Sequence, residues 1–193
     1  MTYPINEIFY SLQGEGFHVG RPAVFVRFAG CNLNCSFCDT NKERNFSLSL
    51  EGIMAEVNRY ECNYVVLTGG EPALFVSDEM IMALHEEGKK LAIETNGTVL
   101  LPKGIDWITL SPKFDFQPNA LLRIHKADEL KVVYTGQDLA PYDGIEAKHR
   151  FVQPCDTGNP TETQQNIGAA VRFCLAHPMW RLSLQTHKLL GLR

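Results

Sequence analysis

The sequence lacks any long hydrophobic run. None of its segments approaches the roughly 18 consecutive apolar residues that a membrane-spanning helix needs. The N-terminus, MTYPINEIFYSLQGEG, also lacks the charged start and apolar stretch of a signal peptide. These absences lead us to expect a cytoplasmic protein that has no membrane partner.

An excess of positive charge is also missing. The chain has 18 Lys and Arg residues against 22 Asp and Glu residues, which gives a net charge of -4 and a pI near 5.9. No basic surface is therefore available to hold a phosphate backbone, and we expect a small polar substrate rather than nucleic acid. No repeat, low-complexity tract or linker interrupts the 193 residues. A length prior of roughly 150 residues per domain then predicts one domain over residues 1–193.

Three of the six cysteines are grouped, and no fourth cysteine lies near them. Cys31, Cys35 and Cys38 fall within AGCNLNCSFCDT. In a reducing compartment, grouped cysteines bind metal or perform redox chemistry more often than they form structural disulfides. Four cysteines would close a structural zinc site or a ferredoxin cluster, so a different ligand must take the fourth position here. Zinc completed by His18 or Asp39 and an iron–sulfur cluster both remain open at this point.

Short apolar segments recur along the chain, and each ends in polar residues or glycine. They are AVFVRFAGC, YVVLTGGEP, LAIETNG, WITLSPK, ELKVVYTG, RFVQPCD and RLSLQTHK. Nearly continuous β-branched and aliphatic runs are typical of parallel strands that are covered on both faces. Ligands of parallel sheets bind at the carboxyl ends of the strands, so these polar signatures should converge there.

The spacing of apolar residues predicts three helices between these strands. The first runs from about Leu50 to Val57, with Ser47 or Ser49 as its N-cap. The second runs from about Asp78 to Glu87, with Ser77 before it and Gly88 after it. The third presents one apolar face before Pro178 ends it. The residues of that face are Ile167, Ala170, Val171, Cys174 and Leu175.

Other connections are too short for full helices, and GTVLLPKGID is predicted to be a loop or a single turn. We therefore predict an α/β fold in the form of a partial TIM-type barrel of parallel strands with a reduced helical layer. A closed eight-unit barrel would need roughly 250 residues. A doubly wound sheet is the alternative. The mixed charges of HKADELK, residues 125–131, favour a solvated surface.

The motif Cys31-x3-Cys35-x2-Cys38 follows the first core strand and resembles the signature of the radical S-adenosylmethionine (radical SAM) superfamily. TGGEP, Thr68 to Pro72, follows the second core strand and resembles the glycine-rich segment of the same superfamily. On its own it could be a tight turn. The resemblance implies a radical SAM core with a 4Fe-4S cluster, in which the three cysteines hold three irons. The fourth iron would bind S-adenosylmethionine (SAM), which yields a 5'-deoxyadenosyl radical on reduction.

Segments from nearly the whole chain resemble the 7-carboxy-7-deazaguanine synthase family of this superfamily. They are SLQGEG, RFAGCNLNCSFCDT, TGGEP, ETNG, SPK, QP and LQTHK. The resemblance implies conversion of 6-carboxy-5,6,7,8-tetrahydropterin to 7-carboxy-7-deazaguanine, a ring contraction with loss of ammonia on the route to queuosine and other 7-deazapurines. It also implies Mg2+ as a further cofactor, a homodimer, and an electron donor such as flavodoxin or ferredoxin.

The same resemblance implies which residues form the site. Implied contacts of SAM are Phe37, Cys38, Asp39, Gly70, Ser111, Pro112, Lys113, Gln153, Pro154, Cys155 and Asp156. Implied contacts of the pterin are Leu12, Gln13, Gly14, Arg27, Thr68, His187, Lys188 and Arg193. Arg27 would bind the carboxylate of the substrate, and Thr40 would ligate the Mg2+ ion. Because the chemistry generates a primary radical, positioning and exclusion of water matter more than acid–base strength.

Several of these residues have a plainer alternative role. Arg27 could form an ion pair with a neighbouring glutamate, and Thr40 could cap a helix. Glu94 and Asn96, at the end of the third strand, could face the cavity or could simply be satisfied polar groups. The residues after QTHK also differ from the family pattern, in which many members end in proline and the terminal carboxylate can reach the substrate.

Two other functions compete with this reading. An activase of anaerobic ribonucleotide reductase resembles the chain in size and in cysteine motif, but it does not need SLQGEG, Arg27 and QTHK together. A zinc-stabilised binding module without activity leaves TGGEP and the polar strand ends unexplained.

Overall fold

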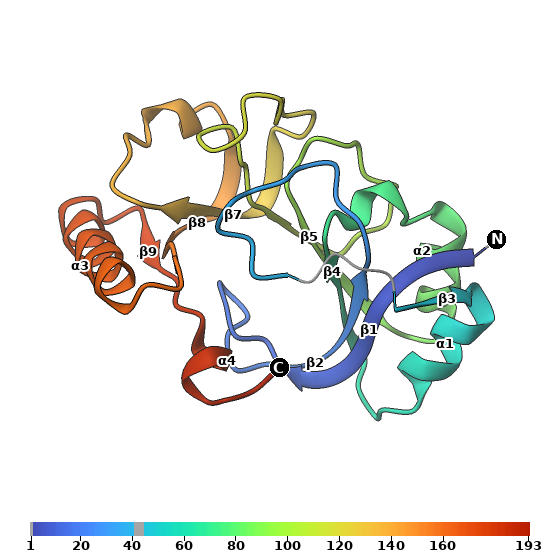
Figure 1. Cartoon of the computed structure of the whole chain (residues 1–193). Coiled ribbons are helices and arrows are strands. Elements are labelled where there is room, and N and C mark those ends of the chain that lie inside the picture. The colour runs from blue at the N-terminus through green and yellow to red at the C-terminus, as the bar shows by residue number, and fades with distance from the viewer. Residues whose placement is uncertain (1, 41–44) are drawn as a thin grey trace.

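The chain forms one curved sheet of nine strands in the computed structural model, which describes residues 2–40 and 45–193 (Figure 1). The strands are β1 (Thr2–Leu12), β2 (Pro22–Phe28), β3 (Phe46–Ser49), β4 (Tyr64–Gly69), β5 (Lys90–Thr95), β6 (Trp107–Leu110), β7 (Lys126–Tyr134), β8 (Glu146–Pro154) and β9 (Arg181–Leu182). They lie in the order β3-β1-β2-β4-β5-β6-β7-β8-β9, and every pair from β2 onward is parallel.

The predicted partial barrel is confirmed. β2 and β4 to β9 correspond to the apolar segments of the sequence, and the sheet is open between its edge strands, β3 and β9. The chain from 96 to 106 and from 111 to 125 connects β5, β6 and β7 without a helix. The helical layer is therefore reduced, as the short connections predicted.

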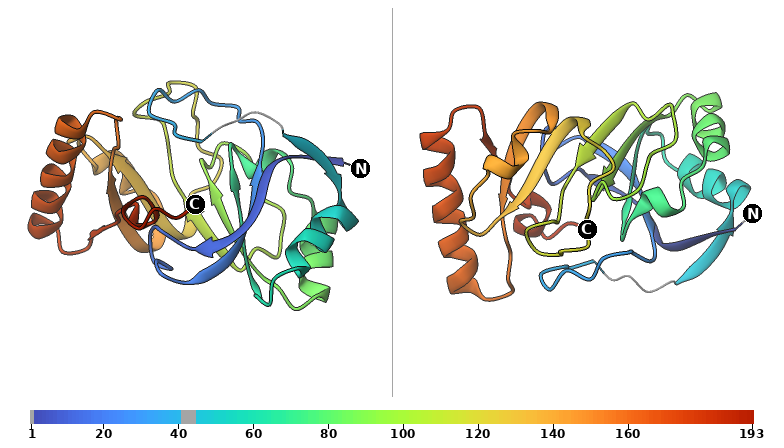
Figure 2. Two further views of the ribbon diagram at one scale, coloured as in Figure 1. Left: turned by 60° about the horizontal axis from the view of Figure 1, so that its bottom comes forward. Right: turned by 90° about the horizontal axis from the view of Figure 1, so that it is seen from above.

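The helices cover the outside of the sheet at its two ends (Figure 2). They are α1 (Leu50–Asn58), α2 (Asp78–Glu86) and α3 (Pro160–Ala176). The short α4 (Thr186–Leu189) lies instead beside the loop that follows β1, and single 3-10 turns lie at Pro72–Leu74 and Ala140–Tyr142. The Ser49 hydroxyl accepts from the Gly52 amide at 3.2 Å, and the Ser77 hydroxyl accepts from the Met80 amide at 3.3 Å. Both predicted N-caps are thus in place. None of the helices in the described part of the chain has the length and apolar character needed to span a membrane.

Alternation along the strands divides the apolar residues between two faces. Val24, Val26, Val65 and Leu67 belong to the core beneath α1 and α2, whereas Ala23, Phe25, Tyr64 and Val66 form a separate cluster on the inner face. A third cluster lies between β7, β8 and α3. The strands are therefore apolar on both faces in their amino-terminal halves, which explains their nearly continuous hydrophobic runs.

Two antiparallel strands were not predicted. β1 pairs with β2 and with β3, and the register of β1 against β2 shifts between Ile5 and Glu7. A bulge of this kind moves the following side chains to the opposite face. The alternation of buried and exposed side chains that begins at Tyr3 and Ile5 is therefore interrupted, and the sequence of β1 does not show the regular period of two that marks a strand.

Two predictions about surfaces were wrong. Residues 125–131 are not simply solvated surface, because β7 begins at Lys126 and buries the side chains of Glu129 and Lys131. The face of α3 is also rotated from the expected one. Ala170 is buried and Cys174 packs against the core as predicted, but Val171 and Leu175 are exposed, and Phe173 packs against the core in their place.

Candidate active site

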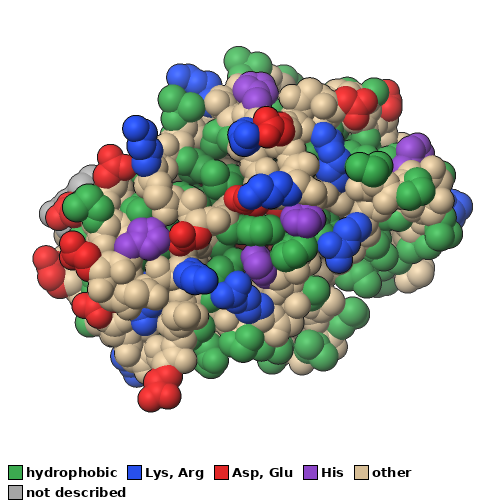
Figure 3. Space-filling view, turned by 180° about the vertical axis from the view of Figure 1, so that it is seen from behind, with side chains coloured by type: hydrophobic (Ala, Val, Ile, Leu, Met, Phe, Trp, Pro, Cys, Tyr) green, Lys and Arg blue, Asp and Glu red, His purple; other side chains and the backbone are tan. Residues whose placement is uncertain are grey.

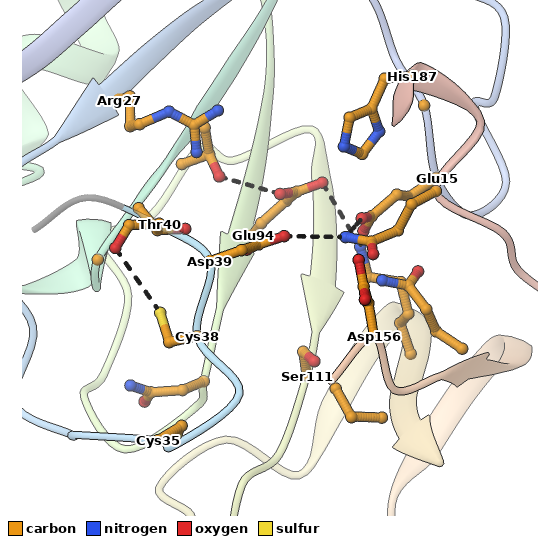
Figure 4. A pocket seen from close by; sticks show the side chains of 18 of the residues that line it. Glu15, Arg27, Cys35, Cys38, Asp39, Thr40, Glu94, Ser111, Asp156 and His187 are labelled. Atoms are coloured by element: carbon orange, nitrogen blue, oxygen red, sulfur yellow. Dashed lines mark hydrogen bonds and ion pairs between the residues drawn. The ribbon is translucent and has the colours of Figure 1, made fainter. Parts of the chain in front are cut away.

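A cavity of about 510 Å³ lies at the carboxyl ends of the strands. It is lined by inner-face residues that follow the apolar halves of four strands, Arg27 on β2, Thr68 on β4, Glu94 on β5 and Lys131 on β7. The polar strand ends therefore converge, as the parallel topology predicted. In Figure 4, Cys35 and Cys38 lie on one side of this cavity, Arg27 and His187 lie on the other, and Glu94 lies between them.

The structure brings nearly all of the predicted site residues to this cavity. Those that line it are Leu12, Gln13, Gly14, Arg27, Cys31, Cys35, Phe37, Cys38, Asp39, Thr40, Thr68, Gly70, Ser111, Lys113, Gln153, Pro154, Cys155, Asp156, His187 and Arg193. Glu94 and Asn96 line it as well. Pro112 and Lys188 do not. Pro112 is buried, and the Lys188 ammonium lies 2.7 Å from Asp39 and 2.8 Å from Asp156.

The cysteine loop presents its three thiols to the cavity. Its three cysteines line the cavity, and the Leu33 amide donates to the Cys31 sulfur at 3.4 Å, a contact that favours a thiolate. Within residues 2–40 and 45–193, no three His, Cys, Asp or Glu side chains are grouped as ligands of one ion.

His18, the alternative zinc ligand, lies at the other end of the barrel. Its ring packs against Tyr64 and Trp107, which begin β4 and β6, at centroid distances of 5.2 Å and 4.4 Å. Phe17 stacks beside it on His149 at 4.2 Å. Figure 3 views the molecule from behind and shows histidine and basic side chains around an apolar centre. The cysteines lie at the carboxyl ends of the strands, so His18 is not placed to complete their coordination.

The glycine-rich segment presses its backbone against the start of the cysteine loop. The Gly70 amide donates to the Phe28 carbonyl at 3.1 Å, and the Glu71 amide donates to the Gly30 carbonyl at 3.0 Å. A Cβ on Gly70 would lie 2.0 Å from the Gly30 oxygen, and Gly69 has a φ of 123°. Only glycine permits this close approach. The backbone that would receive the amino acid part of SAM is consequently bare of side chains.

Glu71 makes TGGEP more than a tight turn. Its carboxylate is fully buried and accepts from the Ala73 amide at 3.0 Å, the Thr95 hydroxyl at 2.7 Å and the Asn96 amide at 2.7 Å. Burial raises the pKa of this carboxyl group, while the hydrogen bonds act in the opposite direction. The Glu71 side chain thereby joins the end of β4 to the end of β5.

Asn96 serves both of the roles that the sequence left open. Its backbone amide donates to the Glu71 carboxylate at 2.7 Å, and its side-chain Nδ2 donates to the Asn32 side chain in the cysteine loop at 3.1 Å. Asn96 is therefore a polar cap on β5 that also braces the cysteine loop.

Lys113 places a positive charge beside the cysteines. Its ammonium donates to the carbonyl and to the hydroxyl of Ser111, both at 2.6 Å. Burial lowers the pKa of Lys113 to about 8, and the nearby Cys35 opposes that shift. A cation at this position suits a site that must hold thiolates and the carboxylate of SAM.

The opposite side of the cavity is organised around Glu94. Its carboxylate accepts from the Gln13 side chain at 3.1 Å and from the Thr68 hydroxyl at 2.9 Å. Arg27 is ion-paired with Glu7 at 2.9 Å, so the plainer alternative for Arg27 is observed, yet the guanidinium still borders the cavity.

Thr40 also borders the cavity. Residues 41–44, which would follow a cap at Thr40, lie outside the described part of the chain.

The C-terminal segment joins the loop that follows β1. The amide and the hydroxyl of Thr186 both donate to the Gly14 carbonyl, at 2.9 Å and 2.8 Å. A Cβ on Gly14 would lie 2.1 Å from the His187 ring, so the glycine leaves room for His187 at the cavity. SLQGEG and LQTHK thus form one wall, although they lie at opposite ends of the sequence.

Sequence reasoning missed the ion pair between Glu15 and Lys131, which also lines the cavity. Gln185 donates to the same Glu15 carboxylate at 3.0 Å. An available signal was the alternation of Glu129 and Lys131 with buried Leu130 and Val132, which is typical of a strand with one polar face.

Comparison with known proteins agrees with this geometry. Residues 25–137 match the model of the radical SAM superfamily. A 7-carboxy-7-deazaguanine synthase of Bacteroides thetaiotaomicron is 52% identical over 193 residues and covers 100% of both chains. The chain belongs to the 7-carboxy-7-deazaguanine synthase family. A second member of this family, from Bradyrhizobium diazoefficiens, is 41% identical over 221 residues, again with 100% of both chains covered.

The fold agrees with a solved member of the family. The crystal structure of QueE from Escherichia coli matches with a TM-score of 0.72 and 29% identity, covering 95% of this chain and 93% of that one. Membership of the radical SAM family implies a 4Fe-4S cluster and SAM as cofactors. The three thiols and the side-chain-free backbone at Gly70 fit both groups.

Proposed function

We propose that this chain converts 6-carboxy-5,6,7,8-tetrahydropterin to 7-carboxy-7-deazaguanine with loss of ammonia. The observation that carries the proposal is the division of one cavity into two sides. The cysteine loop and Gly70 border one side, whereas Arg27, Gln13 and Thr68 border the other. A pterin held on the second side would face the cofactors across the cavity. An activase that acts on a protein substrate would not need these groups on the second side.

The cofactor side would be formed by four segments. Cys31, Cys35 and Cys38 would hold the cluster. The bound cluster and SAM, after one-electron reduction by the electron donor, would supply the 5'-deoxyadenosyl radical that removes hydrogen from the substrate. Contacts to SAM would come from Phe37, Cys38, Asp39, Gly70, Ser111, Lys113, Gln153, Pro154, Cys155 and Asp156, which line the cavity, with buried Pro112 shaping the segment of Ser111.

The substrate side would fix the pterin at several points. Arg27 would bind its carboxylate through a rigid guanidinium, and Gln13 and Thr68, both held by Glu94, would contact the ring. Leu12, Gly14, His187 and Arg193 would complete the wall. Lys188 would act by drawing Asp39 and Asp156 together. Such positioning favours the correct hydrogen over water or protein as the reaction partner.

We also propose that Thr40 ligates a Mg2+ ion that binds the substrate. Its hydroxyl is a hard oxygen ligand, and Thr40 borders the cavity beside Cys38. Replacing Thr40 with Val should raise the Mg2+ concentration needed for half-maximal turnover, while SAM binding should remain unchanged.

A homodimer, a cytoplasmic location and a flavodoxin or ferredoxin as electron donor complete the proposal. The grouped thiols need a reducing compartment. Light scattering during size-exclusion chromatography measures the assembly, and a monomer at micromolar concentration would contradict the dimer.

The test is an anaerobic assay of the reconstituted protein with dithionite, SAM, Mg2+ and 6-carboxytetrahydropterin. Mass spectrometry should detect 7-carboxy-7-deazaguanine, and the Cys35→Ala variant should form none. If 5'-deoxyadenosine forms without this product, the radical chemistry stands and the substrate assignment is wrong.

A further inference from the structure

Lys131 occupies an unusual position for a lysine. Only 7% of its side chain is exposed, and it lies on the inner face of β7, where the strand meets the cavity. Moving an ammonium group out of water is costly unless it is well paired. The partners of Lys131 are therefore central to its role.

Two carboxylates from distant parts of the chain meet this ammonium. Glu15 forms a direct ion pair with it, and Glu94 lies 3.8 Å away on β5. The side chain of Glu15 is 14% exposed, and that of Glu94 is 25% exposed. Lys131 is thus a shared counter-ion between two acidic groups on one wall.

These carboxylates hold the residues that we place around the substrate. Glu94 accepts from Gln13 and Thr68, and Glu15 accepts from Gln185, which precedes the segment of His187. Burial alone would raise the pKa of Glu15, but Lys131 and Gln185 lower it to about 2. The attraction of the Lys131 ammonium therefore opposes the effect of burial on the pKa of Glu15.

We propose that Lys131 is a positioning residue for the pterin, because its ammonium group holds the Glu15 and Glu94 carboxylates where they orient the substrate wall. The inference rests on the proposed function. The amino-pyrimidinone ring of the substrate is rich in N–H donors, and a wall with fixed anionic acceptors is complementary to it. Without the ammonium, the two carboxylates would repel each other, and Gln13 and Thr68 would lose their fixed partner.

The test compares Lys131→Met with Lys131→Arg in the reconstituted enzyme. Lys131→Met should raise KM for the pterin by at least about tenfold, the loss expected when a charged hydrogen-bond network is broken. KM for SAM should stay within about twofold, since no group on the cofactor side has changed. Lys131→Arg keeps the charge and should recover most of the affinity. Lys126→Met, which removes an exposed lysine from the same strand, is the matched control.

A binding measurement separates positioning from turnover. Calorimetric titration with 7-carboxy-7-deazaguanine should show weaker binding to Lys131→Met, while the electron paramagnetic resonance spectrum of the reduced cluster with SAM should match that of the wild type. Unchanged pterin KM and product affinity would overturn the inference. A loss of SAM binding as large as the loss of pterin binding would also overturn it, because that pattern indicates general disruption.

If Lys131→Met does not fold, the double variant Glu15→Gln/Lys131→Met removes both charges of the pair. Its melting temperature should approach that of the wild type while pterin KM stays high, because Glu94 still lacks its cation. Recovery of pterin KM together with stability would show that the pair only supports the fold. A wild-type enzyme without turnover would refute the proposed function, and this inference with it. An active wild-type enzyme in which Lys131→Met leaves pterin KM unchanged would refute the inference alone.

Discussion

Arg27 shows how one residue combines a local contact with a proposed role in binding. The register shift in β1 sets Glu7 opposite Arg27, and their ion pair holds the guanidinium at the border of the cavity. The side chain of Arg27 is 24% exposed, so it can meet a ligand without leaving the pair. The ion-pair role and the substrate role are thus compatible.

Replacing Arg27 with Gln tests the second role. Loss of a charged hydrogen bond costs about 1.5–3 kcal/mol, so we expect KM for the pterin to rise between about tenfold and a hundredfold. KM for SAM should be unchanged. Arg59→Gln, which removes an exposed arginine from another ion pair, is the control. If Glu7→Gln raises pterin KM as much as Arg27→Gln does, Arg27 acts through the pair and not on the substrate.

Gly70 is a residue whose importance lies in an absent side chain. In Gly70→Ala the new Cβ would lie 2.0 Å from the Gly30 carbonyl oxygen, so backbone must move. Overpacking of this kind costs about 1–3 kcal/mol, which corresponds to a loss of SAM affinity of about fivefold to 150-fold. Titration of the reduced cluster with SAM, followed by electron paramagnetic resonance, measures the change. Gly144→Ala has open space for its Cβ and should bind SAM normally. Normal SAM binding by Gly70→Ala would contradict the close approach.

At the scale of secondary-structure elements, side chains as well as helices connect neighbouring strand ends. Glu71 joins the end of β4 to the end of β5, and Asn96 continues the connection into the cysteine loop. This network acts in addition to α2, which crosses from β4 to β5 on the outside of the sheet. The elements that carry Gly70, Glu94 and the cysteines are consequently fixed relative to one another.

Glu71→Gln tests the contribution of this network to stability. The glutamine amide would point a donor at the donors that Glu71 now satisfies, so the free energy of unfolding should fall by about 2–3 kcal/mol. Urea denaturation under anaerobic conditions measures the change. Glu86→Gln replaces an exposed glutamate of α2 and should change stability by less than about 0.5 kcal/mol. Equal stability of both variants would show that Glu71 does not join the strands.

At the scale of the whole molecule, folding and substrate binding rest on different parts of the chain. The apolar clusters are formed by residues up to Leu182, whereas Leu189 and Leu190 in the last segment are exposed. That segment contacts Gly14, Glu15 and Asp39 at the mouth of the cavity. It closes the site without forming part of the core.

Ending the chain after Leu184 should therefore leave a folded protein with an impaired site. The free energy of unfolding should fall by only about 1–2 kcal/mol, because mainly exposed or half-buried hydrogen bonds are lost. KM for the pterin should rise by at least about tenfold, since His187 and the support of Gly14 are gone. The reduced cluster should keep its electron paramagnetic resonance signal. A truncated chain that fails to fold would show that the segment belongs to the core.

Much of the fold followed from local patterns. Apolar runs that end in glycine or polar residues marked the parallel strands, and Ser49 and Ser77 marked two helix starts. β1 escaped prediction because its alternation is interrupted by the bulge near Asn6, and a bulge depends on the strand opposite. The face of α3 was partly misjudged because its contacts with β8 and β9, which the helix sequence does not contain, decide which side is covered.

The sequence by itself determined the cysteine spacing, the glycine-rich segment and the family, since these are properties of neighbouring residues. Only the tertiary structure decided that Lys131 is buried against Glu15 and Glu94, that Glu7 faces Arg27, and that His18 lies far from the cysteines. Each of these relations joins residues that are distant in the chain. Their energies depend on burial and on strand register, which exist only once the sheet has formed.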